Sequence, residues 1–201
     1  MITIIDYGVG NLGSVVNMFK YIGYKTQVTS DKERILEAEK ILLPGVGAFD
    51  HAMTKLNEMG LSKLLRTKAD DGTPLLGICL GMQLLTKGSE EGILQGLGLI
   101  DAYSHSFKKI ENELKVPHMG WNIATVNNDN PLTDNFKEEL KFYFVHSYYV
   151  QVANEADSML KTNYGVSFDS GIAKNNIYGV QFHPEKSHKF GMSLFENFAV
   201  L

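Results

Sequence analysis

The stretch of sequence that decides the fold is Thr73-Pro74-Leu75-Leu76-Gly77-Ile78-Cys79-Leu80-Gly81-Met82-Gln83-Leu84. The apolar run over residues 74–78 predicts a buried strand, and the pattern over residues 80–86 predicts a helix directly after it. Cys79 stands at the junction in a G-x-C-x-G pattern, which is that of a nucleophile elbow with cysteine in place of serine. Because a sharp strand-to-helix turn brings neighbouring backbone close, we expect that only small residues fit at 77 and 81.

The position of Cys79 favours nucleophilic chemistry. A thiol at a helix N-terminus lies at the positive end of the helix dipole, which favours the reactive thiolate. A lone cysteine is more often a small buried apolar residue, but the flanking glycines and the strand–helix context favour a nucleophile here. A different class of protein stays open, namely a non-catalytic binding or redox-sensing subunit in which Cys79 is merely oxidised.

A thiolate nucleophile needs an acid–base partner that a third group orients. The sequence Gln181-Phe182-His183-Pro184-Glu185 ends a β-rich run and supplies such a pair. Residues two apart share one face of a strand, so His183 can carry the thiol proton while Glu185 fixes the tautomer of its ring. We therefore expect a catalytic triad of Cys79, His183 and Glu185.

Acyl transfer through a thiolate also develops an oxyanion, and loss of one preorganised donor costs about 10²–10³ in rate. Backbone amides must therefore point at the reacting carbonyl group. The amide of Leu80, directly after the nucleophile, is one candidate donor. The glycine-rich end of a neighbouring strand, Pro44-Gly45-Val46-Gly47, is a natural source of a second.

The first half of the chain alternates short apolar runs with segments of helix length. Strands are predicted at 2–5, 26–29, 40–43 and 74–78, separated by helical patterns at 12–22, about 49–69 and 80–86 and by a polar stretch at 31–39. Such β-α-β units predict a mostly parallel, doubly wound sheet flanked by helices.

From about residue 97 the pattern changes to β-rich runs joined by short polar turns. Largely antiparallel strands are predicted at 97–103, 120–126, 141–151, 158–164, 168–173 and 177–182. A final helix at about 187–198 places Phe190, Leu194, Phe195 and Phe198 on one side. The length of 201 residues fits one domain over residues 1–201. The expected fold class is α/β, with a parallel core and added antiparallel strands.

The N-terminal glycines suggest another ligand. Gly8-Val9-Gly10-Asn11-Leu12-Gly13 fits the dinucleotide pattern G-x-G-x-x-G, and Asp31 follows about 20 residues later. However, a doubly wound sheet binds its ligand in the crevice at the strand ends, and the stronger pattern around Cys79 places a catalytic site there. We interpret these glycines as allowing a tight strand-to-helix turn, with Asn11 capping the helix.

The composition excludes several kinds of partner. The net charge is −4, the only arginines are Arg34 and Arg66, and no basic run is longer than Lys108-Lys109, which argues against nucleic acid. No apolar run approaches the ~18 residues of a membrane helix. The single cysteine excludes an internal disulfide and a cysteine-rich zinc site and favours a reducing compartment. We expect a cytoplasmic chain without metal or cofactor.

Two further histidines, His118 and His146, stand in unusual surroundings. Their contexts are Pro117-His118-Met119-Gly120-Trp121-Asn122 and Tyr143-Phe144-Val145-His146-Ser147-Tyr148-Tyr149. Both a substrate wall or interface and a plain aromatic β-core are consistent with these contexts.

Together these motifs resemble the class I, triad-type glutamine amidotransferases, and within them the glutaminase subunits of imidazole glycerol phosphate synthase. The resemblance is carried by six blocks, Asp6-Tyr7-Gly8-x-Gly10-Asn11, Leu43-Pro44-Gly45-Val46-Gly47-Ala48-Phe49, Gly77-Ile78-Cys79-Leu80-Gly81-Met82-Gln83-Leu84, Pro117-His118-Met119-Gly120-Trp121-Asn122, Phe144-Val145-His146-Ser147-Tyr148 and Gly179-Val180-Gln181-Phe182-His183-Pro184-Glu185-Lys186-Ser187.

The resemblance implies a flavodoxin-like fold and hydrolysis of glutamine to glutamate and ammonia through a thioester on Cys79. His183 would be the acid–base and Glu185 its orienting group. The oxyanion hole maps to Gly47 and Leu80. Gln83 and the backbone of Ser147 and Tyr148 would hold the amino-acid end of glutamine.

The resemblance also implies a protein partner, a (β/α)₈-barrel cyclase subunit of the HisF type, in a heterodimer of histidine biosynthesis. Residues matching the partner-facing positions of the family are Asn11, Met119, Trp121, Tyr143 and Lys186. Similar chains also hand ammonia to an enzyme that aminates a nucleotide-linked sugar for surface polysaccharide, and the glutaminase residues do not distinguish the two pathways. Because the blocks use almost the whole chain for making ammonia, the acceptor site is expected on another chain.

Overall fold

The computed structural model describes residues 1–110, 114–134, 136 and 139–201. Its parallel core consists of β1 (Ile2–Ile5), β2 (Thr26–Thr29), β3 (Lys40–Leu43) and β4 (Leu75–Ile78). These strands pair in the order β2-β1-β3-β4, which is the order of a flavodoxin-like doubly wound sheet. The strands and the parallel core expected from the first half of the sequence are confirmed.

The second half supplies the remaining strands, which are β5 (Ala102–Ser106), β6 (His118–Val126), β7 (Leu140–His146), β8 (Tyr148–Val152), β9 (Ser158–Asn163), β10 (Ser167–Lys174) and β11 (Ile177–Val180). β11 returns beside β4 and runs parallel to it. From there the sheet continues through antiparallel pairs as β11-β10-β9-β6-β7. The antiparallel character predicted for this half is confirmed.

Several expected strands differ from the structure by one or two residues at an end, and two differ more. Residues 97–101 form no strand, because the amides of Leu97 and Leu99 donate to the carbonyls of Leu84 and Leu85 instead of to a strand partner. The run expected at 141–151 divides at Ser147 into β7, which pairs with β6, and β8, which pairs with β5 and β10. This division places the Ser147 turn between two branches of the sheet.

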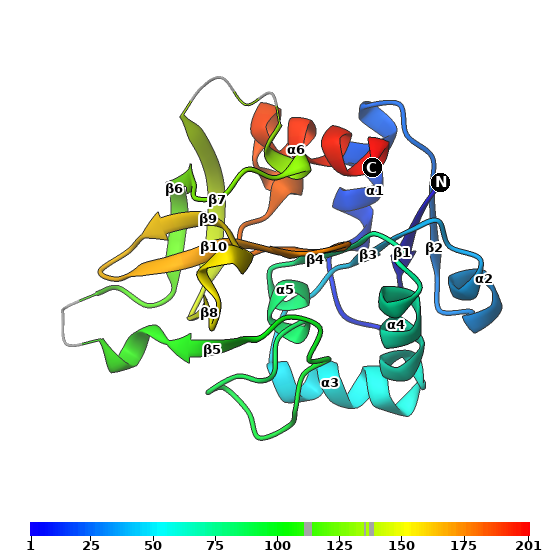
Figure 1. Ribbon diagram of the computed structural model, residues 1–201, viewed down its shortest axis with the longest axis horizontal. Coiled ribbons are helices and arrows are strands. Elements are labelled where there is room, and N and C mark those ends of the chain that lie inside the picture. The colour runs from blue at the N-terminus through cyan, green and yellow to red at the C-terminus, as the bar shows by residue number, and fades with distance from the viewer. Residues whose placement is uncertain (111–113, 135, 137–138) are drawn as a thin grey trace.

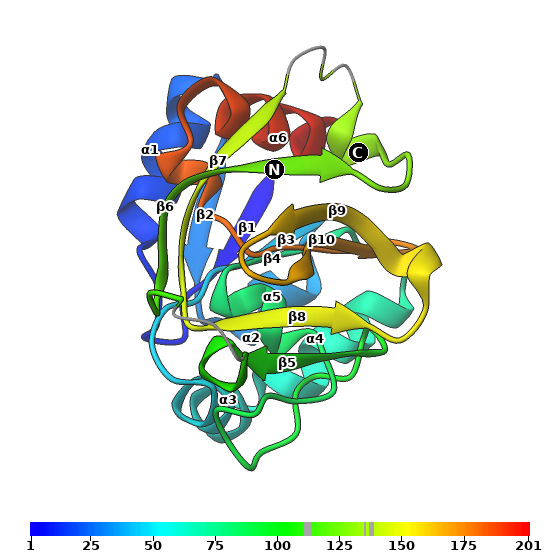
Figure 2. The ribbon, with the colours of Figure 1, turned by 90° about the vertical axis from the view of Figure 1, so that its left-hand side faces the viewer.

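Helices cover both faces of the sheet (Figure 1). α1 (Leu12–Tyr21) and α6 (His188–Val200) lie on one face, and α3 (Phe49–Glu58), α4 (Leu61–Asp70) and α5 (Leu80–Leu84) lie on the other. Figure 2 shows the same layers from the side, with β6 and β7 reaching toward the α1–α6 layer and β5 and β8 toward α3. Parallel strands covered on both faces are buried throughout, which explains their continuous apolar sequences.

The helical pattern expected over residues 49–69 is two helices rather than one. Gly60 separates α3 from α4 with a backbone φ of 68°, a left-handed conformation that ends a helix and that glycine adopts without strain. The polar stretch at 31–39 holds the short helix α2 (Lys32–Leu36), and the Asp31 side chain accepts from the Glu33 amide at 2.8 Å to cap it. Asp31 therefore has a structural role.

Each helical layer has its own apolar core. Between α1 and α6 the rings of Phe19 and Phe195 stack 4.4 Å apart, and Leu194 and Phe198 are fully buried beside them. The apolar side predicted for the last helix is confirmed. On the opposite face, residues of α3 and α4 pack beneath the sheet.

The turn that carries Cys79 is as crowded as the sequence predicts. Cys79 has φ 54° and ψ −111°, a strained conformation for a residue with a side chain. A Cβ atom at Gly77 would lie 2.6 Å from the carbonyl oxygen of Gly81, and a Cβ at Gly81 would overlap the carbonyl oxygen of Leu43. The steric requirement for glycine at 77 and 81 is therefore confirmed, and β3, β4 and α5 pack backbone against backbone.

We predict that Gly81→Ala lowers the free energy of unfolding by about 3 kcal/mol, because the new methyl group has no space. Gly13 is the matched control, since it is a helical glycine at which an added methyl group would meet nothing within 4 Å. Gly13→Ala should raise stability by less than about 1 kcal/mol, through helix propensity. Urea unfolding of both variants measures the difference, and equal stabilities would contradict the crowding.

The N-terminal glycines form the tight turn expected of them. Gly8 and Gly10 have φ of +81° and +128°, and a Cβ at Gly10 would approach the Pro44 ring at 3.2 Å. The prediction that Asn11 caps α1 is wrong: its side chain makes no capping hydrogen bond, and its φ of −94° and ψ of 71° lie outside the extended conformation of capping residues.

Candidate active site

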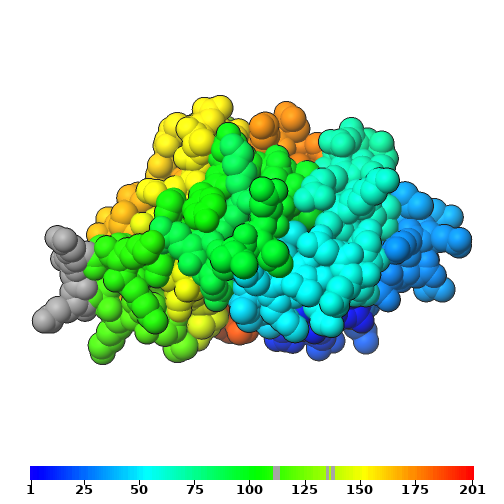
Figure 3. All heavy atoms as spheres, turned by 90° about the horizontal axis from the view of Figure 1, so that it is seen from below, coloured from blue at the N-terminus to red at the C-terminus, as the bar shows by residue number. Residues whose placement is uncertain are grey.

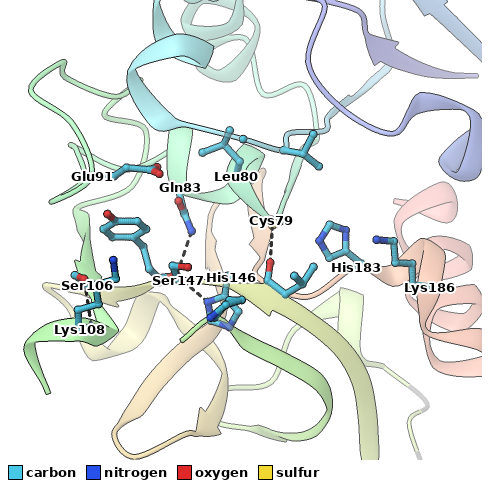
Figure 4. Close-up of a pocket in the computed structure, with 15 residues that line it drawn as sticks. Cys79, Leu80, Gln83, Glu91, Ser106, Lys108, His146, Ser147, His183 and Lys186 are labelled. Carbon is cyan, nitrogen blue, oxygen red and sulfur yellow. Dashed lines mark hydrogen bonds between the residues drawn. The ribbon is translucent and has the colours of Figure 1, made fainter. Parts of the chain in front are cut away.

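The three expected triad residues come together at the carboxyl ends of β4 and β11. Cys79 follows β4, and its amide donates to the Val180 carbonyl at 2.8 Å, while His183 follows β11 and its amide donates to the Tyr143 carbonyl at 2.9 Å. Glu185 lies in the short 3₁₀ turn Pro184–Lys186. The two parallel neighbours thus place the thiol and the imidazole beside each other, as Figure 4 shows.

The histidine and the carboxylate are in direct contact. His183 Nδ1 lies 2.7 Å from Glu185 Oε1, and the two side chains are only 4% and 3% exposed. Burial disfavours the charged ring, but hydrogen bonds to Cys79 and Glu185 and their negative charges outweigh burial and raise the pKa of His183 from 6.5 to about 9. The site therefore favours an imidazolium held between a carboxylate and the sulfur.

Two further groups lie close to the sulfur of Cys79. The Gln181 Nε2 amide lies 3.7 Å from Sγ, and the Val145 carbonyl oxygen lies 4.0 Å from it. Tyr7 supports the neighbouring loop, because its buried hydroxyl donates to the Pro44 carbonyl at 2.7 Å. Burial and the nearby Cys79 raise the pKa of Tyr7 well above its ordinary value, so it stays a donor.

A pocket of about 500 Å³ opens in front of the sulfur. Both oxyanion candidates line it, Leu80 at the start of α5 and Gly47 with φ of +92° after β3. The structure thereby brings both expected residues to the pocket that Cys79 lines. The glycine conformation at 47 is one that residues with side chains rarely adopt.

The far end of the pocket holds the expected glutamine-binding residues. Gln83, Ser147 and Tyr148 all line it. Gln83 is buried, and its Nε2 donates to the Tyr148 carbonyl at 3.2 Å and to Gln181 Oε1 at 3.0 Å. The amide side chain thus joins the wall of the pocket to the residue that contacts the sulfur.

Glu91 also lines this pocket, although sequence reasoning did not single it out. Its Oε2 accepts from the Phe49 amide at 2.9 Å, and burial raises its pKa. Figure 4 shows it on the same side as Gln83, away from His183. The loop that carries Glu91 lies along α3 on the lower face (Figure 3), where Asp50 binds the Ile93 and Leu94 amides. No local motif marks Glu91, because its hydrogen bond with the Phe49 amide joins residues that lie 42 positions apart in the sequence.

Four of the five expected partner-facing residues form one patch that is exposed except at the half-buried Tyr143. Met119 and Trp121 on β6 are 62% and 50% exposed. The Trp121 ring lies 6.1 Å from that of Tyr143, and Lys186 Nζ lies 5.8 Å from the Tyr143 ring centre. Asn11 is exposed at the start of α1, which packs against the turn that carries Lys186. The patch therefore adjoins the turn that carries His183 and Glu185.

The described residues contain neither a cluster of metal ligands nor a membrane-spanning helix. Across residues 1–110, 114–134, 136 and 139–201, no group of three His, Cys, Asp or Glu side chains is arranged to hold a metal ion. In the same part of the chain no helix has the length and apolar character needed to cross a bilayer. That the chain works without a metal or a cofactor stays a prediction.

A buried Cys–His–Glu arrangement at the strand ends of a doubly wound sheet is the geometry of a triad amidotransferase, and the comparison with known families agrees. The chain belongs to the class I glutamine amidotransferase family, whose model matches residues 3–201.

Individual relatives point to a narrower group within this family. The chain is 55% identical over 199 residues to "Imidazole glycerol phosphate synthase subunit HisH 2" of Methanococcus maripaludis, with 98% of each chain covered. It is 48% identical to the protein of the same name in Pseudomonas aeruginosa, with both chains covered completely. Among solved structures, one described as a glutamine amidotransferase superimposes over the whole of both chains with a TM-score of 0.76 at 15% identity. That likeness supports the fold.

Proposed function

We propose that this chain is the glutaminase subunit of an imidazole glycerol phosphate synthase, hydrolysing glutamine to glutamate and delivering the ammonia to a synthase partner in histidine biosynthesis. The observation that carries the proposal is the His183–Glu185 pair buried beside Cys79 in a pocket that Gly47 and Leu80, the two oxyanion candidates, also line. The names of the full-length relatives support the same pathway.

The first half of the reaction follows from the protonation of this triad. The Cys79 thiolate attacks the side-chain carbonyl carbon of glutamine, and the C–S bond forms while the carbonyl electrons move to oxygen. The amides of Leu80 and Gly47 stabilise that oxyanion. The His183 imidazolium then gives its proton to the departing nitrogen, so that the C–N bond breaks and ammonia leaves.

The second half regenerates the enzyme. His183, now neutral, takes a proton from water as the oxygen attacks the thioester carbon. The C–S bond breaks, glutamate leaves, and the thiolate and the imidazolium are restored together. Glu185 holds the Nδ1–H bond throughout, so that Nε2 faces the sulfur and the substrate.

We assign the amino-acid end of glutamine to the wall formed by Gln83, Ser147, Tyr148 and Glu91. The Ser147–Tyr148 backbone and Gln83 supply polar groups for the amino-acid end of the substrate, as the resemblance implies. Glu91 adds the negative charge that the substrate's ammonium group requires, at the end of the pocket away from His183. An ionised partner makes a hydrogen bond roughly twice as strong as a neutral one.

We predict that Glu91→Gln raises the KM for glutamine by about 10- to 100-fold, the loss of one charge-assisted hydrogen bond. The kcat should change by less than about threefold, because the substitution lies away from the reacting bond. Glutamine keeps an oxygen that can accept from the Phe49 amide, so the fold should hold. Steady-state glutamate release measures both constants, and an unchanged KM would contradict the assignment.

Co-purification tests which partner protein receives the ammonia. We propose a HisF-type (β/α)₈-barrel subunit bound to the patch of Met119, Trp121, Tyr143 and Lys186, with Asn11 at its margin. The expected result is a 1:1 complex with a barrel protein that binds the histidine-pathway ribonucleotide and accelerates glutamine hydrolysis. Co-purification with a sugar-aminating enzyme instead would assign the chain to surface-polysaccharide biosynthesis.

A further inference from the structure

We propose that the buried pair His118 and His146 is a positioning device for the glutamine pocket, a directional chain of hydrogen bonds that holds the Tyr148 carbonyl and connects it to the exposed strand β6. The proposal rests on the proposed glutaminase function. Neither histidine belongs to the triad, and neither contacts a reacting atom in the mechanism above.

The two histidines face each other across the β6–β7 pair. Their rings join through His118 Nδ1 and His146 Nε2, 2.9 Å apart, and the residues are 3% and 6% exposed. His118 is stacked between Tyr164 and Phe144, with ring centres 4.0 Å and 4.8 Å away. Stacking against these two rings therefore restricts the orientation of the His118 ring.

The partners at each end decide which nitrogen carries each proton. His146 Nδ1 lies 2.7 Å from the Tyr148 carbonyl, which only accepts, so that nitrogen must donate. In a neutral ring, His146 Nε2 then accepts, and His118 Nδ1 must donate to it. His118 Nε2 accepts in turn from the Asn122 side-chain amide at 3.1 Å.

Both rings are neutral at physiological pH. Burial lowers the pKa of His118 to about 4, and burial together with the charges of His118 and His183 lowers that of His146 to about 3. A neutral pair with Nδ1–H on both rings satisfies every nitrogen, whereas a protonated ring would place two donors against each other. The chain of donors therefore runs one way, from Asn122 to Tyr148.

Beyond Tyr148 the hydrogen bonds continue to the nucleophile. The Tyr148 carbonyl accepts a second bond from Gln83, Gln83 donates to Gln181, and the Gln181 amide lies 3.7 Å from Cys79 Sγ. The Tyr148 carbonyl thus accepts from both Gln83 and His146, and Figure 4 shows these two side chains on opposite sides of the pocket.

The other end of the chain reaches the surface. Asn122 is partly exposed on β6, directly after Trp121 in the exposed patch, and it also donates to the Asn163 carbonyl on β9. Because His118 and Asn122 both belong to β6, a displacement of β6 against β7 would move His118 relative to His146, to which it donates. These hydrogen bonds connect the exposed patch to the pocket wall that we assign to glutamine binding. The connection is separate from the one through the turn that carries His183.

The test uses His146→Phe, which keeps a buried aromatic ring and removes both nitrogens. In the assembled complex the KM for glutamine should rise about tenfold, the loss of one hydrogen bond to the pocket wall. The kcat should change by less than about threefold, and so should the rate at which iodoacetamide, a small alkylating agent, modifies Cys79. An unchanged KM, with or without a fall in kcat and in alkylation, would overturn the proposal.

His105→Phe is the matched control. His105 lies on β5, and its ring centre is 5.8 Å from that of Tyr149, but it is outside the chain of hydrogen bonds. Its substitution should leave the KM within about twofold of the wild type. An equal rise in KM in both variants would show that ring packing alone matters, and would overturn the proposal.

A second measurement is independent of catalysis and of variant folding. Imidazole ¹⁵N chemical shifts of the wild-type protein at pH 7 should show Nδ1–H and an unprotonated Nε2 on both His118 and His146. Nε2–H on His146 would overturn the proposal even if no variant folds. A wild-type complex that fails to hydrolyse glutamine yet shows these tautomers would refute the proposed function instead, so the two failures are distinguishable.

Discussion

Replacing Cys79 with serine should lower the rate of glutamine hydrolysis by about 10⁴-fold or more, the scale of loss when a nucleophile is removed. A serine hydroxyl is much less acidic than a thiol, so the neighbouring His183 no longer holds an anion ready to attack. The crowded backbone around position 79 accepts serine, which is smaller than cysteine, so the fold should be retained. The measurement is the initial rate of glutamate formation by the assembled complex.

The control for Cys79→Ser is the free energy of unfolding, which should stay within about 1 kcal/mol of the wild type. Binding of glutamine to the variant should also persist, because the groups at the far end of the pocket are unchanged. A variant that keeps more than a few per cent of the wild-type rate would show that the chemistry passes through another residue.

The second large effect is expected from Glu185→Gln. The Glu185 carboxylate accepts the proton of His183 Nδ1 and balances the charge of the ring. A glutamine amide can instead donate to Nδ1, which leaves the proton on Nε2 and removes the acceptor that faces the sulfur. The kcat should fall by about 10³- to 10⁴-fold, as when the orienting carboxylate of a catalytic triad is neutralised.

The same variant should change how stability depends on pH. Folding raises the pKa of His183 from 6.5 to about 9, so the contribution of this group is complete below about pH 6.5 and is lost as pH rises to about 9. In Glu185→Gln one of the two groups that raise this pKa is gone. Urea unfolding at pH 6.5 and pH 9 should therefore show a smaller loss of stability in the variant, and an equal or larger loss would contradict the coupling.

The features that the sequence could predict are mainly those formed by residues close together in the chain. The elbow at 77–81 and the His183–Glu185 pair each lie within a few residues, and their strand contexts place them at one edge of the sheet. The strands of the parallel core were predicted because burial on both faces leaves an uninterrupted apolar pattern. The oxyanion candidates followed from the same edge, since the glycine-rich loop over residues 44–47 follows β3 and Leu80 directly follows the elbow after β4; the resemblance narrowed that loop to Gly47.

What the sequence could not predict depends on distant contacts. Glu91 faces the pocket because it binds the start of α3, and no periodic pattern marks such a loop. The pairing of His118 with His146 requires the register of β6 on β7, which spacing does not reveal. The residue type of Asn11 predicts a helix cap, but its φ of −94° and ψ of 71° are not the backbone conformation of a capping residue.

The central claim is that Cys79 forms a thioester with glutamine and that His183 makes it reactive. The most direct measurement is mass spectrometry after treatment of the partner-bound chain with an electrophilic glutamine analogue. The expected result is one adduct per chain on the peptide that contains Cys79, prevented by excess glutamine and absent in His183→Ala. No adduct on Cys79, or equal labelling of the His183→Ala variant, would contradict the claim.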